Sequence, residues 1–182
     1  MPLSQFSHAR VTFNARFQTL YDQAGLCFIL PGAAGSGESK WIKTGVEFMD
    51  GKTNLSTVAS DRWADWSLTP LPATYRSAGG PGAITIEMER YVIDGEPIDT
   101  LAIYVVHEPE DDSQPNERQL MREVTWVFEP GQLENQCWVG VMAAKPTKDD
   151  DDPERALEVT FSKFEISTIH DTRLPEEGRK GI

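Results

Sequence analysis

Apolar and polar residues alternate with a period of two along most of this chain. In residues 11–18, VTFNARFQ, every second side chain is apolar, which is the pattern of a strand with one buried face. Alternation or a short apolar run predicts further strands within residues 26–30, 41–60, 83–107, 122–128, 136–144 and 157–167. No segment keeps the helical spacing of apolar residues for three turns. The sequence therefore predicts an all-β protein.

Two of these runs carry the same turn signal near their centre. Asp50-Gly51 and Asp94-Gly95 each interrupt an alternating run, and both residue types tolerate the positive φ of tight hairpin turns. Because hairpins in series give antiparallel sheets, we expect an antiparallel two-sheet jelly-roll sandwich. The 182 residues suffice for one such domain, predicted over residues 1–170, with a C-terminal tail over 171–182.

The stretch PGAAGSGESK, residues 31–40, is spaced like a phosphate-binding loop. However, Glu38 stands where G-x-x-x-x-G-K-[ST] requires a lysine. A phosphate loop also opens a helix, whose N-terminal N–H groups hold the anion, whereas the residues after Ser39 begin a predicted strand. The sequence therefore predicts a connection between two strands and argues against a nucleotide site.

The formal net charge of −12 narrows the classes of partner. Nucleic acids and anionic membranes are bound by clustered lysine and arginine, so we expect neither as a partner. No apolar run approaches the ~20 residues of a membrane span, and the first residues lack the layout of a secretory signal. These features predict a soluble, cytoplasmic protein.

The sequence gives little support for metal or cofactor chemistry, and we predict neither. The residues that could form zinc motifs are isolated from one another: His8, His107, His170, Cys27 and Cys137. We interpret both cysteines as buried free thiols, with a disulfide or a catalytic thiol as the alternatives. The run DDDD, residues 149–152, lacks the alternating ligands and central glycine of a calcium loop, so we interpret it as a solvated acidic loop.

Aromatic and charged side chains provide the main candidate site. If Ile42 and Val46 fill the core, alternation places Trp41, Lys43 and Glu47 on the outer face of their strand. Tryptophan beside amides and charges suits sugar rings or other small, partly apolar ligands. The Lys43 and Glu47 pair is either a surface ion pair or the polar end of a cleft.

Two further residues extend this set. An inward Leu26 puts Gln23 on the same outer side, and Trp138 provides a second aromatic surface. We interpret Trp66 and Trp126 as core or rim packing.

Five motifs, taken in order, resemble a known family. They are YDQAGL (21–26), WIKTGVEFMDG (41–51), ADWS (64–67), MREVTWVF (121–128) and WVGVMAAKP (138–146). Together they are similar to the regulation-of-enolase protein family, a domain family of unknown function found in fungi and bacteria. The resemblance spans residues 11 to about 167 and implies the concanavalin A-like lectin/glucanase sandwich, with one concave sheet. It implies no settled catalytic residues.

The resemblance also adds one residue to the candidate site. The polar and aromatic motif positions carried over from the family are Asp22, Gln23, Trp41, Lys43, Glu47, Asp65, Trp66, Arg122, Glu123 and Trp138. Arg122 and Glu123 point to opposite faces of their strand, so at most one of them lines a cleft. The predicted ligand-binding set is Gln23, Trp41, Lys43, Glu47, Glu123 and Trp138.

Three functional hypotheses follow from the sequence. The first is lectin-like binding of a saccharide or other small molecule on the concave sheet, with a regulatory role in sugar metabolism. The second is an enzyme in the same cleft, an isomerase, cyclase or glycoside hydrolase, with Glu47 and Lys43 as acid and base. The third is a protein-interaction module for a metabolic enzyme, using the acidic loops. Glu87 and Glu89, which share one side of a predicted strand, are interpreted as a polar face rather than a catalytic pair.

Overall fold

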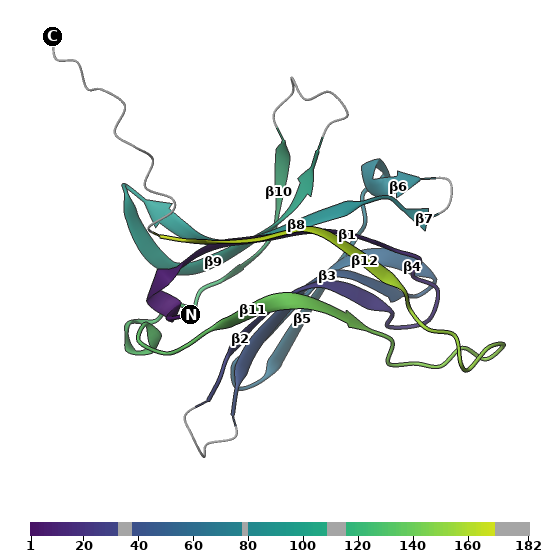
Figure 1. The fold of residues 1–182 in the computed structure, drawn as a ribbon, viewed down its shortest axis with the longest axis horizontal. Helices are drawn as coiled ribbons and strands as arrows, with labels where there is room; N and C mark the ends of the chain where they lie inside the picture. Colours follow the sequence, from purple (N-terminus) through teal and green to yellow (C-terminus); the bar gives the residue numbers. More distant parts are fainter. Residues whose placement is uncertain (33–37, 78–79, 109–115, 170–182) are drawn as a thin grey trace, which may run out of the picture.

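Two antiparallel five-stranded sheets form the protein. The computed structural model describes residues 1–32, 38–77, 80–108 and 116–169. The first sheet has the order β10 (Glu117–Val124), β9 (Glu96–His107), β8 (Ile84–Ile93), β1 (Phe6–Ala15) and β12 (Val159–Thr168). The second has the order β11 (Trp138–Ala144), β2 (Gln23–Leu30), β3 (Lys40–Met49), β4 (Lys52–Ser60) and β5 (Ala64–Pro70). The two sheets lie in separate layers (Figure 1), so the predicted all-β sandwich is confirmed.

Short elements complete the described part of the chain. They are the 3₁₀ helices η1 (Leu3–Gln5), η2 (Ala73–Tyr75) and η3 (Pro130–Gln132) and the small pair β6 (Arg76–Ser77) and β7 (Gly80–Pro81). Within the described residues, no helix has both the length and the hydrophobicity that a membrane span requires. The predicted tail, residues 171–182, lies outside the described residues.

The predicted turns are confirmed. Asp50 and Gly51 join β3 to β4, Asp94 and Gly95 join β8 to β9, and all four residues have positive φ. Leu30 of β2 pairs with Lys40 of β3, so a strand and not a helix follows the glycine-rich stretch. Residues 33–37 of that stretch lie outside the described residues.

Two strands differ from the sequence-based expectation. β5 was not predicted, although its residues alternate, because its side chains are exposed on both faces and give no buried stripe. β10 ends at Val124, whereas a strand was expected over residues 122–128. The chain turns after Val124, and Trp126 packs against the core with Lys40 Nζ 5.4 Å from its ring centroid.

The inward faces of both sheets form one hydrophobic core. Phe6 of β1 meets the edge of Phe28 of β2 at a centroid distance of 5.0 Å, and Phe128 stacks on Phe6 at 6.1 Å. Full burial of such side chains contributes about 1.5–3 kcal/mol each. In β3, Ile42 and Val46 are buried in this core. Alternate residues of the same strand must therefore lie on the outer face of the second sheet.

Candidate functional site

A pair of glycines forms the centre of the outer face of the second sheet. Gly25 of β2 lies directly opposite Gly45 of β3. A Cβ atom on Gly25 would lie 2.0 Å from the carbonyl oxygen of Thr44, and one on Gly45 would lie 2.0 Å from that of Ala24. Neither position can carry a side chain without moving the strands. The middle of this face is therefore a floor of bare backbone.

Lys43 and Glu47 meet above this floor. Residues four apart on a strand are separated by about 13 Å, yet Lys43 Nζ lies 3.7 Å from Glu47 Oε2. The two side chains can reach each other because Gly45, which lies between them on the same face, has no side chain. Glu47 is 4% exposed, whereas Lys43 is partly exposed. The bare floor thus allows a long-reach ion pair along one strand.

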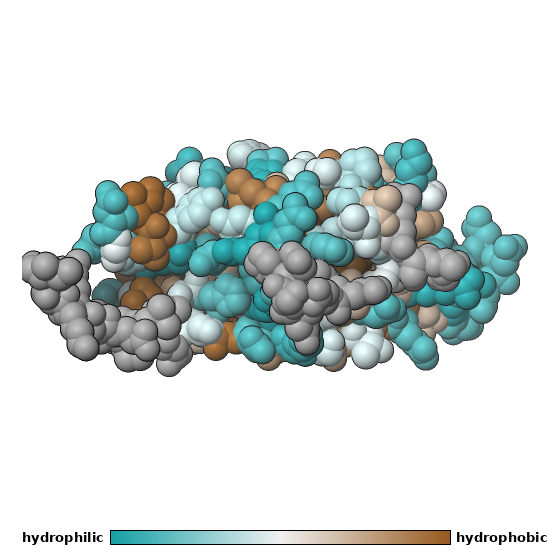
Figure 2. All heavy atoms as spheres, turned by 90° about the horizontal axis from the view of Figure 1, so that it is seen from above, coloured by the Kyte–Doolittle hydropathy of each residue, from teal (hydrophilic) through white to brown (hydrophobic). Residues whose placement is uncertain are grey.

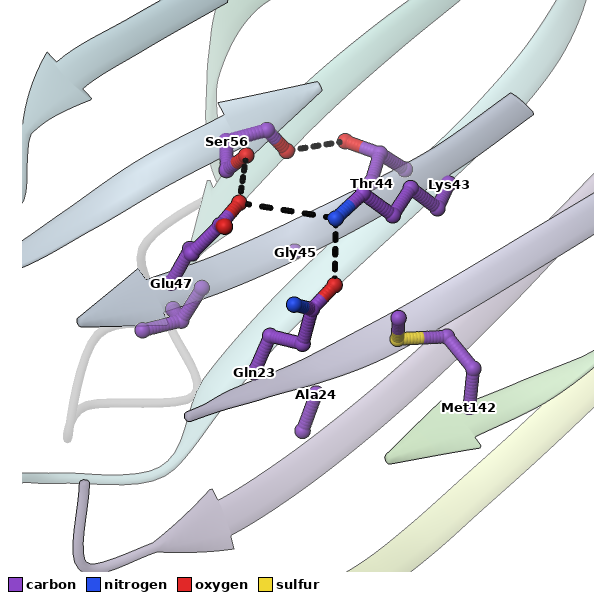
Figure 3. Close-up of a pocket in the computed structure, with 9 residues that line it drawn as sticks. Gln23, Ala24, Lys43, Thr44, Gly45, Glu47, Ser56 and Met142 are labelled. Carbon is purple, nitrogen blue, oxygen red and sulfur yellow. Dashed lines mark hydrogen bonds and ion pairs between the residues drawn. The ribbon is translucent and has the colours of Figure 1, made fainter. Parts of the chain in front are cut away.

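Gln23 joins the pair from the neighbouring strand. Lys43 Nζ donates a hydrogen bond to Gln23 Oε1 (Figure 3). Gln23 Nε2 donates in turn to the carbonyl oxygen of Tyr21 at 3.0 Å. Gln23 lies directly opposite Glu47 in the sheet register. Hydrogen bonds at both Oε1 and Nε2 therefore fix the orientation of the Gln23 amide, and Gln23 holds the Lys43 ammonium group over the glycine floor.

Ser56 and Trp66 complete the group on the other side. Ser56 Oγ donates to Glu47 Oε2 at 2.7 Å and accepts from Trp66 Nε1 at 3.1 Å. The ring of Trp66 also contacts the edge of Tyr21, with centroids 6.4 Å apart. Trp66 is 42% exposed. Its indole is thus fixed at one edge while much of its surface faces solvent.

The arrangement encloses a small hollow with one unused acceptor. Gln23, Lys43, Glu47, Ser56 and Met142 line it (Figure 3). Its volume is about 10 Å³, which is roughly the space that one water molecule needs. Both contacts of the Glu47 carboxylate use Oε2, so Oε1 has no partner among the residues that the structure describes. The second carboxylate oxygen of this nearly buried side chain is therefore available to a hydrogen-bond donor.

The structure brings together part of the predicted binding set. Gln23, Lys43 and Glu47 form the cluster just described. Trp41 and Trp138 lie on the same outer face. Both are register partners of Ile29 in β2, Trp41 from β3 on one side and Trp138 from β11 on the other. They are about 13 Å or more along the strands from the glycine pair. They therefore lie beside the hollow rather than in it.

Two sequence-based assignments change. Glu123 is in β10, opposite Ala102, on the outer face of the first sheet, so it cannot line the same cleft as Glu47. Trp66 was interpreted as packing, but it is the tryptophan that bonds to the polar cluster through Ser56. The sequence signal for Trp66 was its alternation with Asp65 and Ser67. The alternation alone does not identify the partner of Trp66, which follows only from the pairing of β5 with β4.

The first sheet carries a separate polar network on its own outer face. Glu87 is 5% exposed and pairs with Arg10 Nη1 at 2.8 Å and Arg118 Nε at 2.9 Å. Burial opposes the ionisation of Glu87, but His8, Arg118 and Arg10 outweigh it and hold its pKa below the usual range. Hydrophilic residues run across the middle of this face (Figure 2). Both Glu87 oxygens are already paired, so this network resembles a structural layer more than an open site.

The cysteines and the acidic loop of the described residues do not line the hollow beside Glu47. No group of three or more His, Cys, Asp or Glu side chains among the described residues could hold a metal ion. Cys27 and Cys137 are free; Cys137 is buried, Cys27 is partly buried, and burial raises the pKa of both thiols. In the acidic loop, Asp149 Oδ2 lies 3.1 Å from Lys145 Nζ, so this carboxylate is paired within the chain.

Comparison with known proteins places the chain in a family. The model of the family described as "Protein of unknown function (DUF1349)" matches residues 1–169. The chain belongs to the DUF1349 family. An uncharacterized protein of Emericella nidulans is 42% identical over 172 residues, which is 94% of this chain and 74% of that protein.

Two further comparisons, one of sequence and one of structure, lead from this DUF1349 chain to yeast. "Regulation of enolase protein 1" of Saccharomyces cerevisiae is 34% identical over 59 residues, which is 32% of this chain and 27% of that protein. The crystal structure of a functionally unknown protein from Saccharomyces cerevisiae matches with a TM-score of 0.58 and 26% identity, covering 88% of this chain and 68% of that one. The family resemblance seen in the sequence is thereby confirmed. The concanavalin A-like subtype of the sandwich stays a prediction.

Proposed function

We propose that this protein binds a hydroxyl-rich small molecule, a saccharide or related polyol, on the outer face of β2, β3 and β4. The observation that carries the proposal is the hollow above Gly25 and Gly45, where Glu47 Oε1 is unpaired beside Lys43 Nζ. A hydroxyl group both donates and accepts hydrogen bonds. One ligand hydroxyl in the hollow can therefore donate to Glu47 Oε1 and accept from Lys43 Nζ.

The neighbouring tryptophan supports a ring-shaped ligand. A hollow of about 10 Å³ admits one hydroxyl but not a sugar ring, so the ring must lie across the open face. Trp66 is half exposed at that position, and its Nε1 bond to Ser56 fixes its orientation. A pre-oriented aromatic surface gives contact area at low entropic cost. The combination of one deep hydroxyl and one stacked ring favours a saccharide.

The same geometry favours binding over glycoside hydrolysis. The common hydrolytic routes need two carboxylates that flank the scissile bond. Glu47 is the one carboxylate among the described residues that line the hollow. The isomerase and cyclase alternatives are tested by following the ligand itself, because binding leaves it unchanged and catalysis does not.

The physiological setting is part of the same proposal. The name of one yeast relative refers to regulation of enolase, so we propose that the ligand belongs to sugar metabolism and that the protein acts in the cytoplasm. Binding to a metabolic enzyme through the acidic loops is compatible with this setting.

A thermal-shift screen against monosaccharides, sugar phosphates and polyols tests the proposal. We expect at least one sugar to raise the Tm of the wild-type protein and Glu47→Gln to abolish that shift. Glu123→Gln is the matched control, because Glu123 lies on the other sheet and should leave the shift intact. NMR of the incubated ligand distinguishes binding from turnover. No stabilisation by any sugar, or equal stabilisation of the Glu47→Gln variant, would contradict the proposal.

A further inference from the structure

A strip of exposed apolar side chains crosses three strands of the same outer face. Trp138 of β11 pairs with Ile29 of β2, and Ile29 pairs with Trp41 of β3, so the three side chains are neighbours in one row. Adjacent strands are about 4.8 Å apart. Trp138 is 62% exposed, and Ile29 and Trp41 are partly exposed. We call these three residues the aromatic strip.

The aromatic strip continues directly into the proposed binding face. Trp41 and Gly45 are four residues apart on β3, which is about 13 Å. Lys43 lies between them on the same face, but its ammonium group reaches toward Glu47 and therefore away from Trp41. In the row between the strip and the floor, β11 contributes Gly140, and a Cβ there would meet nothing within 4 Å. On β11, therefore, no side chain separates the two regions.

The chemistry of the strip fits the apolar faces of sugar rings. It carries no charge, whereas the hollow holds the ammonium and the carboxylate. Planar aromatic side chains stack against flat apolar surfaces and leave hydroxyls at the rim in water. A single ring at the hollow cannot also cover the strip, since about 13 Å exceeds the length of one ring. A chain of about three rings along β3 would cover both.

We propose that the ligand is a linear oligosaccharide of at least three sugars, with one end at the hollow and the other stacked on the aromatic strip. This inference rests on the proposed function, because it uses Glu47 and Lys43 as the first anchor. The strip then acts as a second subsite that selects chain length. Trp138 and Trp41 contribute to the affinity for long chains and not to the affinity for single sugars.

Calorimetric titration with a length series tests the inference. The probes are linear gluco-, galacto-, manno- and xylo-oligosaccharides, each from one to five sugars. We expect one series to gain affinity up to three or four sugars, and Trp138→Ala to lose about tenfold for the tetrasaccharide while leaving the monosaccharide unchanged. Trp63→Ala is the matched control, because Trp63 is 86% exposed and lies outside the strip. Circular dichroism checks that each variant is folded.

The outcomes separate this inference from the proposed function. Affinity that depends on Glu47 but not on chain length overturns the second subsite and leaves the first proposal standing. Absence of binding at every length overturns both. Light scattering gives the third outcome: a wild-type dimer that becomes monomeric in Trp138→Ala would show that a second copy of the chain covers the strip, which also overturns the inference.

Discussion

Gly25 and Gly45 face each other across β2 and β3, and each lies too close to the opposite backbone to carry a Cβ atom. The contact sets the geometry of the whole face. Without side chains at these two positions, Lys43 can reach Glu47 along β3 and Gln23 across β2. The polar cluster and the hollow are thus consequences of one close approach between two strands.

Gly45→Ala should destabilise the protein and displace the Lys43–Glu47 pair. The added methyl would lie 2.0 Å from the carbonyl oxygen of Ala24, which is backbone and cannot rotate away. Overpacking of this kind costs about 1–3 kcal/mol or more. Gly140→Ala is the control on the same face, because its Cβ would meet nothing within 4 Å, and we expect a change within about 0.5 kcal/mol. Urea unfolding of the two variants measures the difference, and equal stability would refute the role of the close approach.

Lys43 and Glu47 should show energetic coupling. Glu47 is nearly buried, so Lys43→Met leaves its carboxylate without the cation, whereas Lys43→Met combined with Glu47→Gln removes both charges. We expect the double variant to lose less stability than the sum of the two single variants, by about 1 kcal/mol. A double-mutant cycle from chemical denaturation gives this value. Strict additivity would mean that the 3.7 Å pair contributes nothing to folding.

Ionisation of Glu87 should account for part of the change in the free energy of unfolding with pH. Its pKa is lower in the folded protein than in the unfolded chain, so its contribution is present above the unfolded pKa of about 4.3 and is lost as the pH falls through the lower folded value. Glu87→Gln removes this ionisation. We expect the stability difference between wild type and Glu87→Gln to shrink on acidification below about pH 5. Tm values of both proteins between pH 7 and pH 3 measure it, with Glu123→Gln as control. A difference that is constant with pH would contradict the assignment.

Lys145→Met should weaken the attachment of the loop between β11 and β12 to Asp22. Lys145 Nζ lies 3.6 Å from Asp22 Oδ1 and 3.1 Å from Asp149 Oδ2, and Asp22 accepts hydrogen bonds from the backbone of Gln18 and Thr19. Loss of the ammonium leaves the buried Asp22 without its cation. We expect a Tm lower by several degrees.

The matched control for that variant is Lys148→Met. Lys148 is exposed on the same connection, and we expect its substitution to leave the Tm within about one degree. A similar Tm for the two variants would show that the Lys145 pairs do not support the loop.

The side on which each residue lies could be read from the sequence where one face is buried. The alternation around Ile42 and Val46 placed Trp41, Lys43 and Glu47 outward, and the structure agrees. Period-two patterns give this information because neighbouring side chains on a strand point to opposite faces.

The partners of each residue could not be read in the same way. Gly25 and Gly45 face each other because of the pairing register between β2 and β3. The pattern within one strand does not determine this register. For the same reason Glu123 was grouped with Glu47, although β10 belongs to the other sheet. Trp66 was undervalued because its partner Ser56 lies on a neighbouring strand.

Backbone amide NMR of the labelled protein during titration with a stabilising saccharide tests the central claim most directly. A ligand that occupies the hollow must approach the bare backbone of the glycine floor. We therefore predict that the largest shift changes are at the amides of Gly25 and Gly45, and that Glu47→Gln removes them. Changes centred on Glu87 and Arg118, on the outer face of the first sheet, would contradict the account.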